Sequence, residues 1–112
     1  MTKIFNLDEL STQAGGEYVL GLKALKTHAV YMVYGSLKPG DDGRKLLPGK
    51  GHEEILCITM GEVVVDGLNG SFIMKSGEAF HLREDDEYHL KNESEHEVKY
   101  VLAGGHPPVQ HK

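Results

Sequence analysis

The most constraining feature of this 112-residue sequence is a series of short apolar runs separated by glycine-containing turns. Pro-Gly, Asp-Gly and Asn-Gly pairs, which supply the backbone angles of tight turns, occur at 39–40, 66–67 and 69–70. The runs are rich in the strand-forming residues Val, Ile, Tyr and Leu, and they cover 18–25, 29–37, 54–60, 62–66, 71–74, 79–82, 88–91 and 96–102. About eight short strands at this spacing predict an all-β sandwich or barrel.

The two ends of the chain have a different character. Residues 6–13 predict one short helix, with Asn6 as its cap and Gly15-Gly16 as its end. Two prolines in the tail, 104–112, remove backbone donors, so we expect the tail not to continue a central strand. A chain of this length fits one domain, expected over 1–112, with an N-terminal arm at 1–16 and the tail at 104–112.

Charge and hydropathy argue against several classes of protein. A net charge of −5 disfavours nucleic-acid binding, which usually needs a basic face. No apolar run approaches the roughly 20 residues of a membrane span, and the N-terminus lacks the apolar core of a signal peptide. The one cysteine, Cys57, has no partner for an internal disulfide, and we expect it to be an inert, buried residue. These features predict a cytoplasmic protein with no nucleic-acid or membrane partner.

A histidine and a carboxylate stand at the start of the third run. Because successive side chains of a strand point to opposite faces, His52 and Glu54 share one face with Leu56, Ile58 and Met60. This places an imidazole and a carboxylate at the mouth of a strand that is apolar further in. Such an arrangement suits a pocket with a polar end, for either a metal ion or a small polar ligand.

The order of these pieces resembles the cupin family of small barrels with a double-stranded β-helix, or jelly-roll, fold. Glu54, followed after six residues by Gly61, is similar to the second half of the family's first motif. Gly77, followed by an apolar strand, a turn and Asn92, is similar to the second motif. Fifteen residues, 62–76, lie between the motifs, as in compact members of the family.

The family's metal-binding histidines are the main departure from this resemblance. The His-x-His of the first motif would fall at Pro48 and Lys50, or one residue earlier at Leu47 and Gly49. In the second motif, Tyr88 stands at the histidine position when the sequences are aligned without gaps. His89 reaches that position if the acidic turn before it carries one extra residue or a bulge.

Two interpretations of the candidate metal ligands remain open. In the first, His52, Glu54 and His89 hold a divalent transition metal such as Zn, Fe, Ni or Mn, since imidazole and carboxylate suit these ions. In the second, His52 and Glu54 form a surface pair beside the strand. His81 and Tyr88 are candidate ligand-binding residues: His81 shares a strand face with the small Ala79, and either Tyr88 or His89 points inward.

The resemblance implies a small-molecule-binding protein with its pocket inside the barrel. With a metal, the expected activity is in the dioxygenase, isomerase or decarboxylase range of the family. Without one, the alternative is a binding or sensing module that has no catalytic activity. Early strands that are apolar on both faces, with Tyr18, Tyr31, Met32 and Tyr34, favour association, and the resemblance implies that the protein is a homodimer.

Overall fold

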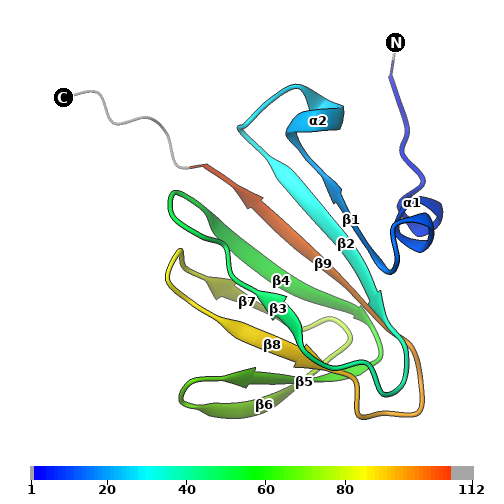
Figure 1. Cartoon of the computed structure of the whole chain (residues 1–112), viewed down its shortest axis with the longest axis vertical. Coiled ribbons are helices and arrows are strands. Elements are labelled where there is room, and N and C mark those ends of the chain that lie inside the picture. Colours follow the sequence, from blue (N-terminus) through cyan, green and yellow to red (C-terminus); the bar gives the residue numbers. More distant parts are fainter. Residues whose placement is uncertain (1, 107–112) are drawn as a thin grey trace.

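The computed structural model describes residues 2–106, which form two antiparallel sheets packed face to face (Figure 1). The first sheet contains, in spatial order, β1 (Glu17–Leu20), β2 (Tyr31–Leu37), β9 (Val98–Gly105), β4 (Glu53–Met60) and β7 (Ala79–Leu82). The second contains β3 (Arg44–Leu46), β8 (Tyr88–Lys91), β5 (Glu62–Gly67) and β6 (Gly70–Lys75). The all-β prediction is confirmed.

Each of the eight predicted runs contains a strand, but three local predictions are wrong. The run 18–25 ends as a strand at Leu20, because Gly21 starts a single helical turn, α2 (Leu22–Leu25), that the left-handed Lys26 closes. The short strand β3 was not predicted. Strand β9 continues through Gly104 and Gly105, two residues into the expected tail, and residues 107–112 of that tail lie outside the described residues.

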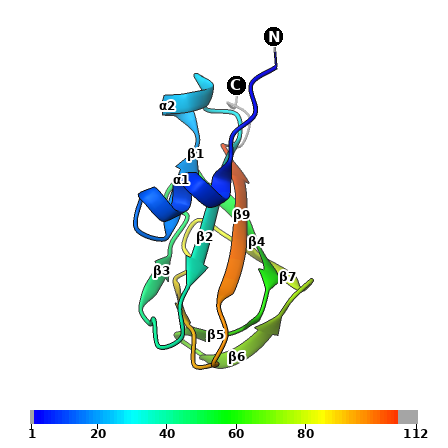
Figure 2. The same ribbon diagram turned by 90° about the vertical axis from the view of Figure 1, so that its right-hand side faces the viewer.

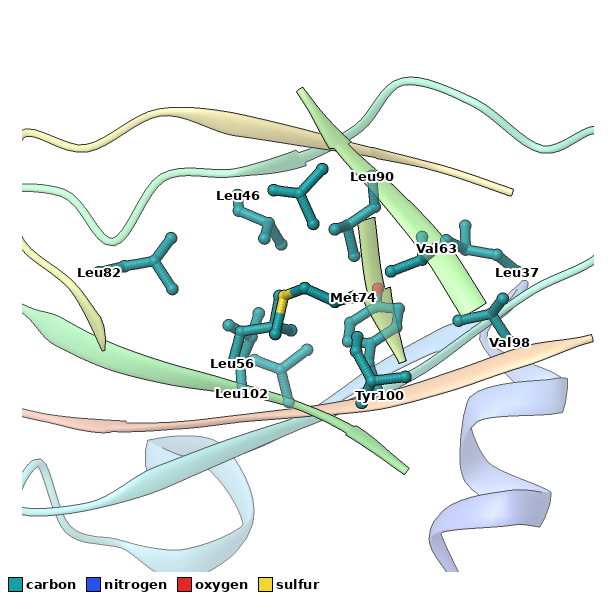
Figure 3. Packing of buried hydrophobic residues seen from close by; sticks show 13 residues of the cluster. Leu37, Leu46, Leu56, Val63, Met74, Leu82, Leu90, Val98, Tyr100 and Leu102 are labelled. Carbon is teal, nitrogen blue, oxygen red and sulfur yellow. The ribbon is translucent and has the colours of Figure 1, made fainter. Parts of the chain in front are cut away.

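The core lies between the two sheets and follows the strand alternation. Val33 and Leu37 of β2, and Leu56 and Ile58 of β4, face inward and are buried, while their neighbours in sequence face outward. The second sheet contributes an equivalent set of inward residues, so that 13 buried apolar side chains form a single cluster (Figure 3). Two of the polar residues that are buried beside this cluster lie next to strand ends, Glu54 near the start of β4 and Asn92 just after β8.

Two residues of the cupin-like motifs have structural roles. Gly61 joins β4 to β5 with a φ of +86°, and a Cβ there would lie 2.7 Å from the carbonyl oxygen of Glu97, so only glycine fits. The side-chain amide of the buried Asn92 donates hydrogen bonds to the carbonyl oxygens of Leu37 (3.0 Å) and His96 (2.7 Å). Asn92 therefore ties the loop after β8 to the end of β2.

The predicted N-terminal helix is confirmed as α1 (Leu7–Gln13), and the Asn6 side chain accepts a hydrogen bond from the backbone N–H of Glu9 (3.1 Å). It packs against β1 and β2 (Figure 2). There Asp8 accepts hydrogen bonds from Tyr34 Oη (2.7 Å) and Lys99 Nζ (3.1 Å). Neither helix within residues 2–106 is long and apolar enough to cross a membrane.

Candidate functional site

A pocket of about 350 Å³ lies at the end of the barrel where β2 and β4 begin and β9 ends. Its apolar wall consists of Val19, Leu22, Val30, Val33 and Pro48. Its polar residues come from β2, β4 and the segments that flank them, and they are Thr27, His28, Tyr31, His52, Glu54 and His106. The pocket therefore combines an apolar side with a polar end, as small-molecule sites usually do.

The polar end is built around three residues that lie side by side on neighbouring strands. In the register of the first sheet, Gly104 of β9 is directly opposite Tyr31 of β2 on one side and Glu54 of β4 on the other. All three positions face inward, and a Cβ on Gly104 would lie 2.5 Å from Tyr31 Cζ and 2.9 Å from Glu54 Cγ. Because Gly104 has no side chain, Tyr31 and Glu54 meet over its backbone. The Tyr31 hydroxyl donates a hydrogen bond of 2.5 Å to Glu54 Oε2.

Glu54 is a buried carboxylate with a neutral partner. Its exposed fraction is only 8%, and within residues 2–106 it forms no ion pair with a Lys, Arg or His side chain. Burial, followed by the hydrogen bond to Glu54 and the charge of Glu54, raises the pKa of Tyr31 above its usual value near 10. Tyr31 therefore stays protonated and keeps donating to Glu54 throughout the physiological range.

Histidine side chains surround the outer part of the polar end. The His52 ring lies edge-on to the Tyr31 ring, with 5.6 Å between their centroids, and 4.0 Å from the His106 ring. His28 contacts His106 from another side at 5.8 Å. Within residues 2–106, His52 Nδ1 is the one buried side-chain nitrogen or oxygen without a hydrogen-bond partner. The pocket thus contains one polar atom whose partner the described residues do not supply.

The structure brings together two of the five predicted site residues. His52 and Glu54 line the same pocket, and they do not form the surface pair that was their alternative role, since Glu54 is buried and no ion pair among the described residues joins the two. His89 is not with them. It lies on β8 of the second sheet, between the buried Leu90 and the inward Tyr88, and it faces outward opposite Lys45 and Asp66.

Tyr88 and His81 also lie away from this pocket. Tyr88 faces inward, above Gly67, and packs edge-on against Phe80 at 5.2 Å and Phe72 at 6.1 Å. It borders a separate depression beside the β5–β6 turn. His81 is on the outer surface of β7, where its Nε2 is 2.5 Å from Glu53 Oε1. The question left open by the sequence is answered, because Tyr88 points inward and His89 outward.

Comparisons of sequence find neither a protein family whose profile matches this chain nor a curated protein that is similar to it. Comparison of structures does find proteins of similar fold. An uncharacterised conserved protein with a double-stranded β-helix domain from Klebsiella pneumoniae subsp. pneumoniae superposes with a TM-score of 0.71 at 17% identity, over 94% of this chain and 90% of that one. A Cupin_2 domain of an XRE family transcriptional regulator from Enterobacter cloacae gives 0.67 at 17% identity, over 83% of this chain and 99% of that one. The chain has the cupin fold.

The Cnp3 cupin domain of Schizosaccharomyces pombe is a further structural neighbour, with a TM-score of 0.63 at 18% identity. This alignment covers 70% of the present chain, which spans about half (54%) of the length of that structure. At such identities the likeness shows the fold alone, because one fold carries many functions. What this cupin-like protein binds has to be argued from its own pocket.

The metal ion that the resemblance implies does not fit the residues at this site. Within residues 2–106, no group of three or more His, Cys, Asp or Glu side chains lies close enough together to hold a metal. The predicted set of His52, Glu54 and His89 is not formed, because the β8 strand turns His89 outward and brings the ring of Tyr88 inward. One of the two carboxylate oxygens of Glu54, Oε2, already accepts a hydrogen bond from the Tyr31 hydroxyl.

Sequence analysis identified Glu54 and His52 but missed the other polar residues of the pocket. The sequence placed Tyr31 only among the aromatic residues of an early strand that favour association, and it placed Gly104 in the tail. One signal was available: Tyr31 has the same strand parity as the apolar Val33 and Leu37, which places it on the inner face. That it meets Glu54 depends on the register of β9 with both strands, which no pattern in the sequence specifies.

Proposed function

We propose that this cupin-like protein binds a small organic molecule in the pocket around Tyr31 and Glu54, and that it does so without a transition metal. The observation that carries the proposal is the hydrogen bond between Tyr31 and the buried Glu54 at the polar end of a pocket that also has an apolar wall. A buried carboxylate lowers stability unless it is compensated, and a single neutral hydroxyl compensates it only in part. A bound ligand is the simplest source of the rest.

The dimensions and composition of the pocket support a small ligand. A volume of about 350 Å³ is at the lower end of the range for small-molecule sites, which begins at roughly 300 Å³. Val19, Val30 and Val33 offer one side to an apolar body, while Glu54 and His52 offer hydrogen bonds at the other. This division between an apolar wall and a few polar atoms fixes the orientation of a ligand.

A metal-dependent activity is the competing hypothesis, and the donor set argues against it. His52 and Glu54 are two possible donors, and His28 and His106, although they line the same pocket, do not complete a group of three within the described residues that is close enough to hold a metal. A catalytic zinc or iron site generally takes three donors from the protein. Metal analysis of protein purified without an affinity tag tests this part directly. We expect less than about 0.1 equivalent of any transition metal, since two weak donors do not retain the ion. One equivalent that is lost on His52→Ala would overturn it.

Ligand binding is tested by a thermal-shift screen of sugars, organic acids, amines and nucleotides. At 100 times its Kd, a ligand adds about 2.7 kcal/mol of stability by mass action, roughly 10 °C for a domain of this size. To show where it binds, the screen is repeated with Val30→Phe, which fills the rim of the pocket at a residue that is 57% exposed. Leu68→Phe, at a fully solvated turn, is the matched control.

We expect at least one compound to raise the melting temperature of the native protein and of Leu68→Phe, and to have little effect on Val30→Phe. A screen without any stabilising compound, or one whose hits stabilise all three proteins equally, would contradict the proposal. The first result means that no ligand of these classes binds, and the second that binding occurs elsewhere on the surface.

A further inference from the structure

The structure contains the same arrangement of a tyrosine, a glycine and a glutamate twice. In the first, Tyr31 and Glu54 meet over Gly104 of the strand between them. In the second, Tyr100 of β9 and Glu17 of β1 meet over Gly35 of β2, and the Tyr100 hydroxyl donates to Glu17 Oε2 at 2.5 Å. We call these the Glu54 triplet and the Glu17 triplet. Their comparison shows what the pocket lacks.

The Glu17 triplet has a cation of its own. Arg44 Nη1 donates a hydrogen bond of 2.5 Å to Tyr100 Oη and lies 3.7 Å from Glu17 Oε2. The charge of Glu17 is thus balanced by a guanidinium, and the Tyr100 hydroxyl is both donor and acceptor. The Glu54 triplet has no cation that corresponds to Arg44, because none of the ion pairs within residues 2–106 includes Glu54. Glu54 is nevertheless the more buried of the two glutamates.

The unused polar atoms next to the Tyr31–Glu54 hydrogen bond can all act as acceptors. The Tyr31 hydroxyl already donates its one hydrogen to Glu54, so what remains on Tyr31 Oη is lone pairs. Glu54 as a carboxylate accepts only. The unpartnered Nδ1 of His52 also accepts when the ring proton is on Nε2. A ligand that matches this end of the pocket must bring hydrogen-bond donors and, to balance Glu54, a positive charge.

We propose that the ligand of this pocket is a small organic cation, a primary or secondary ammonium group on an apolar body, and this inference rests on the proposed function. A primary ammonium has three N–H donors and no acceptor, so it suits a site whose free atoms are acceptors. Its charge takes the place that Arg44 has in the Glu17 triplet. The apolar body lies against Val19, Val30 and Val33. An anionic ligand is disfavoured, because no Lys or Arg lines the pocket within the described residues.

Three probes of one shape separate charge from shape: isopentylamine, isopentanol and isovalerate. Calorimetry or NMR titration at pH 7 gives their dissociation constants. A hydrogen bond to a charged group is worth about 1.5–3 kcal/mol, so we expect the amine to bind roughly 10- to 100-fold more tightly than the alcohol. Isovalerate should bind more weakly than either. The preference should disappear in Glu54→Gln.

Glu53→Gln is the matched control, since Glu53 is next in sequence on β4 but points outward to His81. It should keep the preference for the amine. If Glu54→Gln does not fold, NMR of the native protein decides instead. On titration with the amine, the amide resonances of Tyr31, Glu54 and Gly104 should shift, and those of the acidic turn 84–87 should not.

The outcomes distinguish this inference from the proposed function. Equal affinity for the amine and the alcohol, or an amine preference that survives in Glu54→Gln, would overturn the cationic ligand and leave a ligand-binding pocket in place. Resonance shifts confined to 84–87 would also overturn it, because the amine would then be held by surface carboxylates. Absence of any binding by the three probes overturns the cationic ligand, while the wider thermal-shift screen tests separately whether the pocket binds a small molecule at all.

Discussion

Replacing Gly104 by alanine tests whether the Glu54 triplet is held as described. Gly104 does not have a positive φ, so its backbone accepts an L-residue without strain. The new Cβ, however, would lie 2.5 Å from Tyr31 Cζ, 2.6 Å from Tyr31 Oη and 2.9 Å from Glu54 Cγ. These distances are far below van der Waals contact, so one or both side chains must move. The hydrogen bond between them is lost as they do.

The expected destabilisation follows from three terms. Overpacking in an interior costs about 1–3 kcal/mol, and loss of a hydrogen bond to a charged group about 1.5–3 kcal/mol. Alanine in a strand restores about 0.5–1 kcal/mol relative to glycine. Because movement of Tyr31 relieves the overlap while it breaks the hydrogen bond, the first two terms do not add fully. We expect Gly104→Ala to lower the free energy of unfolding by about 2–4 kcal/mol, or the melting temperature by about 8–16 °C.

A double-mutant cycle with Tyr31→Ala assigns this loss to the triplet. Tyr31→Ala removes the hydrogen bond and the nearest overlap in advance, so Gly104→Ala should then destabilise less than it does in the native protein. Urea unfolding of the four proteins should give a coupling energy of at least about 1 kcal/mol. Additive effects within about 0.5 kcal/mol, or a stable Gly104→Ala protein, would refute the geometry of the site.

Three further predictions concern stability and assembly. Tyr31→Phe leaves the buried Glu54 without its hydrogen-bond donor and should lower the free energy of unfolding by about 1.5–3 kcal/mol. Tyr34→Phe removes an exposed hydrogen bond to Asp8 and should change the free energy of unfolding by less than about 0.5 kcal/mol; equal effects would contradict the burial of Glu54. Because burial raises the pKa of Tyr100, its hydroxyl proton is lost at a lower pH in the unfolded chain than in the folded protein, so stability should fall as pH rises above about 10. In urea unfolding measured at increasing pH, this loss of stability should be smaller for Tyr100→Phe than for the native protein. We propose that two copies associate through the outer face of the first sheet, where the exposed Met32 and Ile55 lie on either side of Ala103. Sedimentation velocity should show a native dimer and an Ile55→Lys monomer, and a native monomer at every concentration would contradict this.

The fold was largely predictable because its determinants are local. Alternation of apolar and polar residues specifies which face of each strand is buried, and the glycine pairs mark the turns. The failures were equally local in origin. Residues 22–25, Leu-Lys-Ala-Leu, continue the apolar run of β1 but consist of helix-forming residues, and between Gly21 and the left-handed Lys26 they form one helical turn. Residues 104 and 105 follow an apolar run and precede two prolines, and hydrogen bonds to β2 and β4 extend the strand through both.

The site was only partly predictable because it depends on register. Parity alone placed Glu54 on the inner face, and the structure agrees. The choice between Tyr88 and His89 required the geometry of the turn 84–87, where an extra residue would have reversed the two faces of β8. In the structure Leu90 is buried, so Tyr88 on the same face of β8 points inward. His89, the third expected metal ligand, therefore points outward. The partner of Glu54 comes from a strand 23 residues earlier in the chain, across a third strand that no local pattern links to either.

Stability alone does not account for the Glu54 triplet. A glycine within a strand costs about 0.5–1 kcal/mol, and burial of a carboxylate costs more unless it is paired, so apolar residues of similar volume would close this end of the barrel at lower free energy. The Glu17 triplet has a structural benefit that offsets such costs, because Arg44 of β3 joins it to the second sheet. The Glu54 triplet joins only strands of one sheet, since β2 and β4 are each already hydrogen-bonded to β9 between them. Its remaining acceptors face the pocket, and a ligand that forms hydrogen bonds with them offsets the free-energy cost that packing alone does not.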